Sequence, residues 1–499
     1  MSISSPSPIV LSLPPAWWPA VGETAREFGP VRLDIIAGTI PAGLRGTLYR
    51  NGAARLERGG LRCGHWFDGD GAIAAIRFEM DAQTGEPSVT ATQKFVRTTG
   101  YIAEERAGKL LYGNYGTVAS GAFWNRWRRP VKHSANTSVM ALPDRLLALW
   151  EGGPPYALDL NTLATRGLDT TIAPSSYSAH PKRDPHSGEI YNFGVAIGAK
   201  TSLTLYRHRT NGQPIAQREH PIADLGLSGL PVLHDFVMAG RYLVFCVPPV
   251  AANPLEIVAG LKTYSDSMTW YGDRATTILV FDRETLQFVS RGEADPWFQW
   301  HFANGFEDEA GRVVVDVARY DDFTTNEFLR QVSQGAIETE TSARLERVIL
   351  DPISGRCLAR ETRIDRHCEF PIVAPEAVGT DADRIFVVTR RPEGQPFGDL
   401  FGAIGRYDVT EDRLTVLDCG DRVYPSEPIF VSGAVADSGN SGASGDRDSW
   451  LIFPVFLAET QRSEVWIVPA DRVEEGAVCR LALPEIVPIG FHGTWHAMK

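Results

Sequence analysis

The turn that decides the fold reads Asp351-Pro-Ile-Ser-Gly355, and relatives of it recur along the chain. In such a turn the Asp and Ser side chains bond the backbone, and Gly adopts the left-handed conformation. The pattern returns at Asp81-Ala-Gln-Thr-Gly85 and Asp184-Pro-His-Ser-Gly188, with degenerate versions at 159–163, 282–286 and 408–412. Turns of this kind join antiparallel strands, so they predict a chain built from many hairpins.

Short runs of β-type residues lie between these turns, whereas helical periodicity is scarce. The runs are 73–78, 146–150, 242–247, 277–281, 313–317, 384–389 and 450–454. Hairpins that repeat over a long chain favour a β-propeller, in which a closed ring buries most strand edges. Dividing 499 residues among seven blades gives about 71 residues per blade. We therefore expect an all-β fold and a seven-bladed propeller.

Composition excludes several classes of protein. The net charge of −12 and the pI near 5.5 argue against a nucleic-acid partner, which usually requires a basic face. The six cysteines form no Cys-x-x-Cys pair, so we expect reduced thiols in a cytoplasmic protein. Nothing resembles a signal peptide, and no apolar run approaches the ~18 residues of a membrane span.

The chain shows no convincing domain boundary. Prolines interrupt the first thirty residues, so residues 1–30 are predicted to form an extended N-terminal arm. Residues 31–499 are predicted to form a single β-propeller catalytic domain.

Four histidines stand far apart in distinctive contexts. They are His180 in Ser-Ala-His-Pro, His234 in Leu-His-Asp-Phe, His301 in Trp-His-Phe-Ala-Asn, and His492 in Phe-His-Gly-Thr-Trp. The first three are separated by roughly one blade length each, and the last follows about three blades later. If they converge on one axis, they form an all-imidazole site suited to iron, copper or zinc.

An all-imidazole site leaves the charge of a metal uncompensated, so carboxylates are expected close behind the ligands. Three glutamates stand in apolar contexts where a bare carboxylate would be costly, namely Glu151, Glu369 and Glu427. A carboxylate that accepts the second imidazole N–H fixes the tautomer of the ring. This combination indicates metal-dependent oxygen chemistry.

At these motifs the chain resembles the carotenoid cleavage oxygenases, and within them the bacterial apocarotenoid 15,15'-oxygenases. The ordered set of motifs runs from Gly46 to Trp495 and includes 46–52, 65–71, 94–98, 135–137, 147–153, 179–181, 234–236, 303–307, 368–371, 426–431 and 492–495. Two positions depart from the family pattern, Ala72 where Met is usual and Gly305 where Ala is usual. Both lie away from the proposed ligands and bear on the shape of the pocket.

The resemblance implies a seven-bladed β-propeller with loops and short helices capping the iron-bearing face. It implies non-haem Fe(II) bound by His180, His234, His301 and His492, with Glu151, Glu369 and Glu427 behind the ligands and His180 without a carboxylate. It places the methyl group of Thr137 near an open iron position. Trp150, Trp300 and Phe370 adjoin these residues and are candidates for the wall of a substrate tunnel.

The function implied is an Fe(II)-dependent dioxygenase that uses O2 to split a carbon–carbon double bond of an apocarotenoid into two carbonyl products of the retinal type. One alternative is a stilbene-cleaving oxygenase of the lignostilbene type, in which Tyr101 and Lys132 contact a phenol. The other is a carotenoid or lipid carrier without catalysis. The complete set of proposed ligands and glutamates argues against the carrier.

Two segments suggest peripheral contact with a membrane. Residues 121–130 interleave Phe123, Trp124 and Trp127 with arginines, and residues 254–261 are largely apolar. Together they are predicted to form a hydrophobic patch at the mouth of a tunnel, where a lipid-dissolved substrate enters. The alternative is that both segments pack on the propeller as core helices.

The other histidines are interpreted as structural. His65 stands near Asp68 and Asp70, but Phe-Asp-Gly-Asp-Gly is typical of a tight turn and not of a second metal site. No convergent context surrounds the remaining six, which are His133, His186, His208, His220, His367 and His496.

Overall fold

Antiparallel strands in separate small sheets make up most of the regular structure. The computed structural model describes residues 14–119, 131–196, 201–253, 256–257, 261–433 and 449–498. Within these ranges the α-helices are α1 (Thr99–Ala107) and α4 (Thr324–Gln334). Short 3₁₀ turns are η1 (Trp18–Ala20), η2 (Trp66–Asp68), η3 (Ser265–Ser267), η4 (Pro375–Ala377) and η5 (Val473–Glu475). The expectation of an all-β fold is confirmed.

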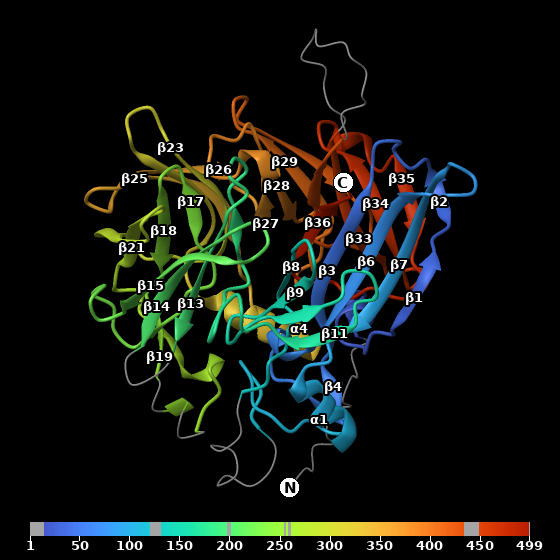
Figure 1. Cartoon of the computed structure of the whole chain (residues 1–499), viewed down its shortest axis with the longest axis horizontal. Coiled ribbons are helices and arrows are strands. Elements are labelled where there is room, and N and C mark those ends of the chain that lie inside the picture. Colours follow the sequence, from blue (N-terminus) through green and yellow to red (C-terminus); the bar gives the residue numbers. More distant parts are fainter. Residues whose placement is uncertain are drawn as a thin grey trace, which may run out of the picture.

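Strands from both ends of the chain share two sheets. One has the order β1 (Phe28–Arg32), β7 (Pro87–Phe95), β6 (Asp70–Met80), β3 (Gly46–Arg55) and β36 (Gly493–Ala497). The other has the order β2 (Ile35–Gly38), β35 (Cys479–Ala482), β34 (Arg462–Pro469), β33 (Ser449–Leu457) and β31 (Val423–Pro425), and β32 (Ile429–Ser432) also pairs with β33. The blue and red ends of the chain therefore lie side by side (Figure 1).

Five four-stranded sheets lie between these in the sequence. Their orders are β11 (Thr165–Leu168), β10 (Tyr156–Leu158), β9 (Leu146–Leu149), β8 (Ser138–Ala141); β12 (Lys182–Arg183), β13 (Ile190–Ala196), β14 (Ser202–His208), β15 (Pro214–Pro221); β17 (Val237–Ala239), β18 (Tyr242–Val247), β21 (Thr276–Asp282), β22 (Phe288–Ala294); β23 (Phe298–Glu307), β24 (Val313–Tyr320), β25 (Ala343–Asp351), β26 (Arg356–Ile364); and β27 (Cys368–Ile372), β28 (Arg384–Thr389), β29 (Ala403–Asp408), β30 (Arg413–Asp418). Smaller pairings join β16 (Leu230–Pro231), β19 (Val250–Ala252) and β20 (Met268–Trp270), and β4 (Glu57–Arg58) with β5 (Leu61–Arg62).

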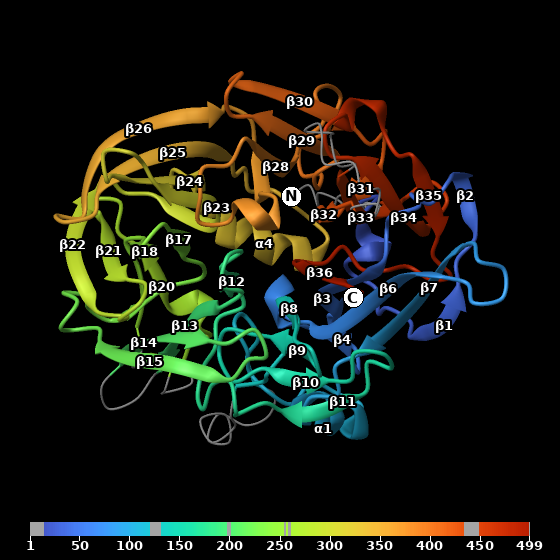
Figure 2. The same cartoon turned by 45° about the horizontal axis from the view of Figure 1, so that its top comes forward.

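The sheets follow one another around a common centre, with α4 lying across it (Figure 2). Every residue of β18 and of β24 is buried, whereas most residues of the outermost strands β15 and β26 are exposed. A strand that packs against a neighbouring sheet on each face favours a continuous run of apolar residues. It does not show the alternation of apolar and polar residues that is typical of a half-exposed strand. The hydrophobic cores accordingly lie between sheets: one of them joins Val244 and Val280 to Val315 and Val348.

The recurring turns have the predicted conformation. The Asp81 carboxylate accepts hydrogen bonds from the backbone N–H groups of Gln83 (2.9 Å) and Thr84 (3.1 Å). Gly85 follows at a φ of 71°, and Gly355 takes the equivalent place at 68°. In a degenerate turn Leu286 occupies this left-handed position at 57°.

The described part of the N-terminal segment packs against the main body. Trp17 is fully buried and shares a core cluster with Val332, Leu400 and Phe456. The division into an arm of residues 1–30 and one domain of residues 31–499 stays a prediction. Within the described ranges, none of the helices combines the length and apolar character needed to cross a bilayer.

Candidate metal centre

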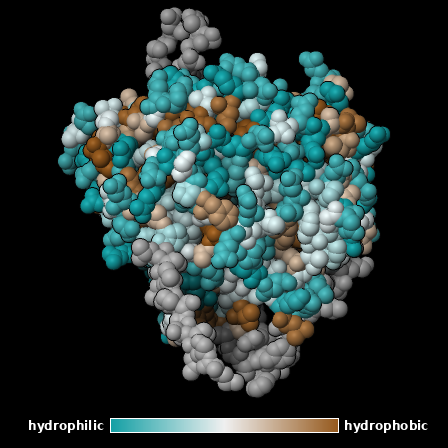
Figure 3. Space-filling model, turned by 180° about the vertical axis from the view of Figure 1, so that it is seen from behind, coloured by the Kyte–Doolittle hydropathy of each residue, from teal (hydrophilic) through white to brown (hydrophobic). Residues whose placement is uncertain are grey.

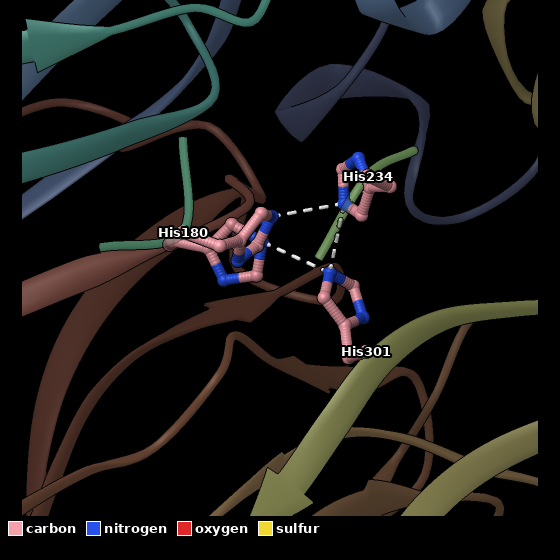
Figure 4. A group of neighbouring side chains, drawn as sticks. His180, His234 and His301 are labelled. Atoms are coloured by element: carbon pink, nitrogen blue, oxygen red, sulfur yellow. Dashed lines mark hydrogen bonds between the residues drawn. The ribbon is translucent and has the colours of Figure 1, made fainter. Parts of the chain in front are cut away.

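Four imidazole rings meet at the centre of the ring of sheets. His180 precedes β12, His234 precedes β17, His301 lies in β23 and His492 precedes β36. One ring nitrogen from each lies within 4.8 Å of the others, and the rings of His180, His234 and His301 point toward one another in Figure 4. The Nε2–Nε2 distances are 2.9 Å for His180–His234, 3.3 Å for His234–His301 and 3.1 Å for His301–His492. All four residues are 8–9% exposed.

Two of these rings donate their other N–H to a glutamate, and a third lies against one. His301 Nδ1 lies 2.5 Å from Glu369 Oε2, and His492 Nδ1 lies 2.8 Å from Glu427 Oε1. His234 Nδ1 is in close contact with Glu151 Oε1, but this contact lacks the geometry of a hydrogen bond. A proton on Nδ1 leaves a bare lone pair on Nε2, which therefore faces the centre. Among the residues that the structure describes, no carboxylate pairs with His180.

The electrostatics keep Glu369 and Glu427 ionised. Burial alone would raise the pKa of Glu369, but the facing His301 holds it below its ordinary value. The pKa of Glu427 is likewise lowered, because His492 and Arg50 outweigh burial. Burial and the three other imidazoles push the pKa of His180 well below its ordinary value, so this ring is neutral.

This donor set fits a divalent transition metal. Nε2 lone pairs that converge at about 3 Å repel one another and cannot all form hydrogen bonds. A cation at the point where they meet satisfies all of them. Neutral imidazoles suit iron, copper or zinc, and the buried carboxylates compensate the positive charge that such ligands leave.

Arg50 and Tyr320 orient the glutamates, and neither was singled out from the sequence. Glu427 Oε2 accepts from an Arg50 guanidinium N–H at 2.8 Å, in a buried ion pair. The Tyr320 hydroxyl donates to Glu369 Oε1 at 3.1 Å. Arg50 lies within the family motif of residues 46–52, and that motif was the feature of the sequence from which Arg50 could have been identified. Tyr320 ends the apolar strand β24, and nothing in its local sequence marks it.

Asp235, directly after His234, connects the three segments that carry His180, His234 and His301. Its Oδ2 accepts from the backbone N–H of Phe302 at 3.0 Å, and its Oδ1 pairs with Lys182 Nζ at 2.8 Å. These contacts connect the residues that follow His180, His234 and His301. The Asp in the motif Leu-His-Asp-Phe thus positions three ligand-bearing segments.

A cavity of about 470 Å³ opens onto the histidines. Its walls include Thr137, Trp150, Trp300 and Phe370, together with His234, His301 and His492. The Phe370 ring stacks on His301 with centroids 5.2 Å apart. The Trp300 ring meets His234 edge-on at 5.0 Å, and its N–H donates to Thr325 Oγ1 at 3.1 Å. The structure thus places the three predicted wall residues and Thr137 around one space.

Thr137 is held between the ligand segments by its backbone. Its carbonyl accepts from the His492 N–H at 3.2 Å, and its N–H donates to the Leu149 carbonyl at 3.3 Å. Its hydroxyl donates to Asn136 Oδ1 at 3.3 Å. The adjacent Asn136 amide binds the Phe67 carbonyl at 2.8 Å, which links Thr137 to the turn at residues 65–71. The role of Thr137 beside an open metal position stays a prediction.

The contact of Tyr101 and Lys132 with a phenol is a wrong expectation. Both residues are buried, and neither lines the cavity. Lys132 Nζ is paired with Asp70 at 2.6 Å and with Glu104 at 2.7 Å. An ammonium held between two carboxylates is not available to a substrate.

The motif around His65 is structural. His65 Nδ1 accepts from the Phe67 N–H at 3.2 Å, and Asp68 binds the loop at Gly116 and Thr117.

Of the two segments predicted to contact a membrane, 121–130 lies outside the described residues. The other, 254–261, is described only at 256, 257 and 261.

Comparisons with known proteins agree with this geometry. A family model described as retinal pigment epithelial membrane protein (RPE65) matches residues 22–497. The apocarotenoid-15,15'-oxygenase of Synechocystis is 29% identical, covering 98% of each chain. The lignostilbene-alpha,beta-dioxygenase isozyme III of Sphingomonas paucimobilis is 26% identical, covering 92% of each. The crystal structure of cobalt-substituted Synechocystis ACO superposes with a TM-score of 0.83 at 28% identity, covering 97% of this chain and 98% of that one.

We predict that the purified protein carries about one iron per chain and that replacing His180, His234, His301 or His492 by Ala removes most of it. Each change deletes a lone pair that converges on the centre. Metal analysis of the purified variants measures this. His208→Gln is the matched control, because His208 is buried but bonds the Ile172 carbonyl, away from the site. Full iron in all four Ala variants contradicts the assignment.

We predict that Glu369→Gln weakens iron binding or activity by about 10–100-fold without unfolding the protein. Gln can still bond Tyr320, but it carries no charge to compensate the metal. Iron affinity, turnover and thermal melting are measured together. Glu189→Gln is the control, since that carboxylate pairs with Arg207 away from the cavity. Unchanged iron content and kinetics in Glu369→Gln exclude the role.

Proposed function

The chain belongs to the family of the retinal pigment epithelial membrane protein, the carotenoid cleavage oxygenases, and we propose that it is an Fe(II)-dependent dioxygenase that cleaves a carbon–carbon double bond of an apocarotenoid. The observation that carries the proposal is the meeting of four imidazoles at the wall of an aromatic-lined cavity. When bound there, Fe(II) supplies the redox chemistry with O2. One O2 is consumed and the two alkene carbons become two carbonyl groups, so the atoms balance.

The protein residues bind and orient the substrate. His180, His234, His301 and His492 hold the metal, and Glu151, Glu369 and Glu427 fix three of these rings. Trp150, Trp300 and Phe370 offer flat apolar faces that suit a conjugated polyene. The glutamates at the site are committed to imidazoles, and the cleavage requires no acid or base beside the double bond. Thr137 narrows the space next to the metal.

A polyene fits this cavity better than a stilbene does. A hydroxystilbene needs partners for its phenol groups, and Lys132 and Tyr101 are withdrawn from the cavity. A polyene needs only apolar contact along most of its length. A carrier without catalysis would not require the carboxylates behind the imidazoles.

We propose that the seven sheets of four or more strands among the described residues are the blades of one propeller. Figure 2 supports this by their order around the centre. The blades make residues 31–499 a single catalytic domain, with residues 1–30 as an arm and with loops and short helices over the iron-bearing face.

We propose that the protein is cytoplasmic and associates peripherally with membranes through residues 121–130 and 254–261. All six cysteines are unpaired, which suits a reducing compartment. Val118 and Val131, on either side of the first segment, are 50% and 59% exposed, and both line the cavity. Leu261 is 66% exposed. Figure 3 shows a hollow bordered by hydrophobic side chains at the lower end of the molecule.

We predict that the iron-loaded protein consumes O2 and forms two carbonyl products from an apocarotenal. Its kcat/KM for a hydroxystilbene should be at least about tenfold lower, because Tyr101 and Lys132, the residues expected to contact a phenol, do not line the cavity. An oxygen electrode and product chromatography measure both reactions. His301→Ala is the inactive control. Faster cleavage of the stilbene would reverse the order of the two candidate functions.

We predict that replacing Phe123, Trp124 and Trp127 together by Ser lowers liposome binding and turnover of lipid-dispersed substrate. Polyenes partition into lipid, and aromatic side chains suit the interface, where neighbouring arginines pair with lipid phosphates. Flotation with anionic vesicles and metal analysis provide the readouts. Iron content should not change. If flotation is the same as for the wild type, these residues do not hold the protein on the membrane.

A further inference from the structure

His367, one of the histidines that the sequence left without a role, lines the cavity. It directly precedes β27, and its ring lies 4.8 Å from the Phe401 ring and 6.4 Å from the Tyr320 ring, measured between centroids. Its backbone carbonyl accepts from Thr389 Oγ1 at 2.8 Å and from the Arg390 N–H at 3.3 Å. The side chain is therefore held in one place by β28 and by two aromatic neighbours.

The tautomer of His367 follows from its surroundings. Nδ1 accepts the backbone N–H of Ala343 at 2.9 Å, so this nitrogen carries a lone pair. Burial lowers the pKa of the ring to about 4, which keeps the imidazole neutral at physiological pH. A neutral ring with a lone pair on Nδ1 has its proton on Nε2. His367 thus presents an N–H donor at Nε2.

Among the described residues, His367 Nε2 has no hydrogen-bond partner. It is also absent from the set of polar atoms that are both unpaired and fully buried, so it keeps some accessible surface. Because the residue lines the cavity, Nε2 is accessible from it. Two other polar groups that line the cavity are already engaged, whereas Thr341 Oγ1 is buried there without a partner. The Arg390 guanidinium donates to the Pro396 carbonyl at 2.6 Å, and the Tyr424 hydroxyl bonds Asp399. A donor left free on a mostly apolar wall is the usual means of orienting a ligand.

His367 stands at a fixed offset from the metal centre. Tyr320, which packs against its ring, bonds Glu369, and Glu369 bonds His301. A polar group bound at His367 therefore sets how far along the cavity the rest of the molecule reaches. For a polyene, this distance decides which double bond lies beside the four histidines.

We propose that His367 donates its Nε2–H to the carbonyl oxygen at the oxidised end of an apocarotenoid and so positions the double bond that is cleaved. The inference rests on the proposed function and names the substrate end that this part of the cavity recognises. A donor without an acceptor matches a carbonyl better than a hydroxyl, which would also need a place for its own proton. Conjugation makes the oxygen of a polyene aldehyde electron-rich, and the nearby positive charge of Arg390 favours such an oxygen.

Two variants separate the functions of the two ring nitrogens. In His367→Asn, the amide oxygen can take the place of Nδ1 and keep the bond from Ala343, while the donor at Nε2 is lost. In His367→Gln, the amide N–H2 reaches toward the place of Nε2 and keeps the donor. Each variant is tested with an apocarotenal and with the hydrocarbon of equal polyene length in which a methyl group replaces the aldehyde.

Binding is measured by quenching of tryptophan fluorescence, since Trp66, Trp150 and Trp300 line the cavity. Products are separated by chromatography to find the bond that is cut. We expect His367→Asn to weaken aldehyde binding by about five- to tenfold and to spread cleavage over neighbouring bonds, the effect of one lost hydrogen bond. Binding of the hydrocarbon and iron content should not change. His367→Gln should retain most of the preference for the aldehyde.

The outcomes distinguish the inference from the proposed function. If the wild type cleaves the apocarotenal and His367→Asn matches it in affinity and in cleavage position, the role of His367 is overturned and the function stands. An equal loss with both ligands shows that His367 is structural and also overturns the inference. If the wild type neither binds nor cleaves either polyene, the proposed function fails and the inference fails with it.

Discussion

The meeting of four imidazole nitrogens at one point is the constraint on which the rest of the site depends. Bare lone pairs approach to 2.9–3.3 Å only around a cation, and each ring must keep its proton on the far nitrogen. That requirement explains the buried carboxylates of Glu369 and Glu427. Each carboxylate in turn needs further donors, which Tyr320 and Arg50 provide. The arrangement extends outward because a buried charge is stable only when its hydrogen bonds are satisfied.

The arrangement of the sheets makes such a centre possible. Separate sheets around one axis allow residues far apart in sequence to meet, each from its own sheet or from the loop before it. Because β36 joins β3, the C-terminal His492 is anchored in the core and does not lie on a free tail. Apolar packing between sheets stabilises the ring, which leaves the centre free for polar groups.

Two kinds of recognition act in the cavity, namely apolar contact with aromatic rings and hydrogen bonding to a single donor. Aromatic faces such as Phe370 and Trp300 contact any flat apolar molecule and confer little preference along its length. A single accessible donor such as that of His367 sets a position along that length, because an unmatched N–H is costly in apolar surroundings. Lys132 shows the opposite case: ion pairs withdraw its charge from the cavity wall.

The sequence by itself determined the strand content, the hairpin turns and the four histidines with their three glutamates. These features are local, since a turn, an apolar run or a motif is written within a few residues. Only the tertiary structure decided that Tyr320 and Arg50 hold Glu369 and Glu427, that Lys132 is paired with carboxylates and does not line the cavity, and that His367 lines it. Side-chain direction and partner depend on which strands become neighbours. Ala343 reaches Nδ1 of His367 across 24 residues, and Arg50 reaches Glu427 across 377, so no local pattern records either contact.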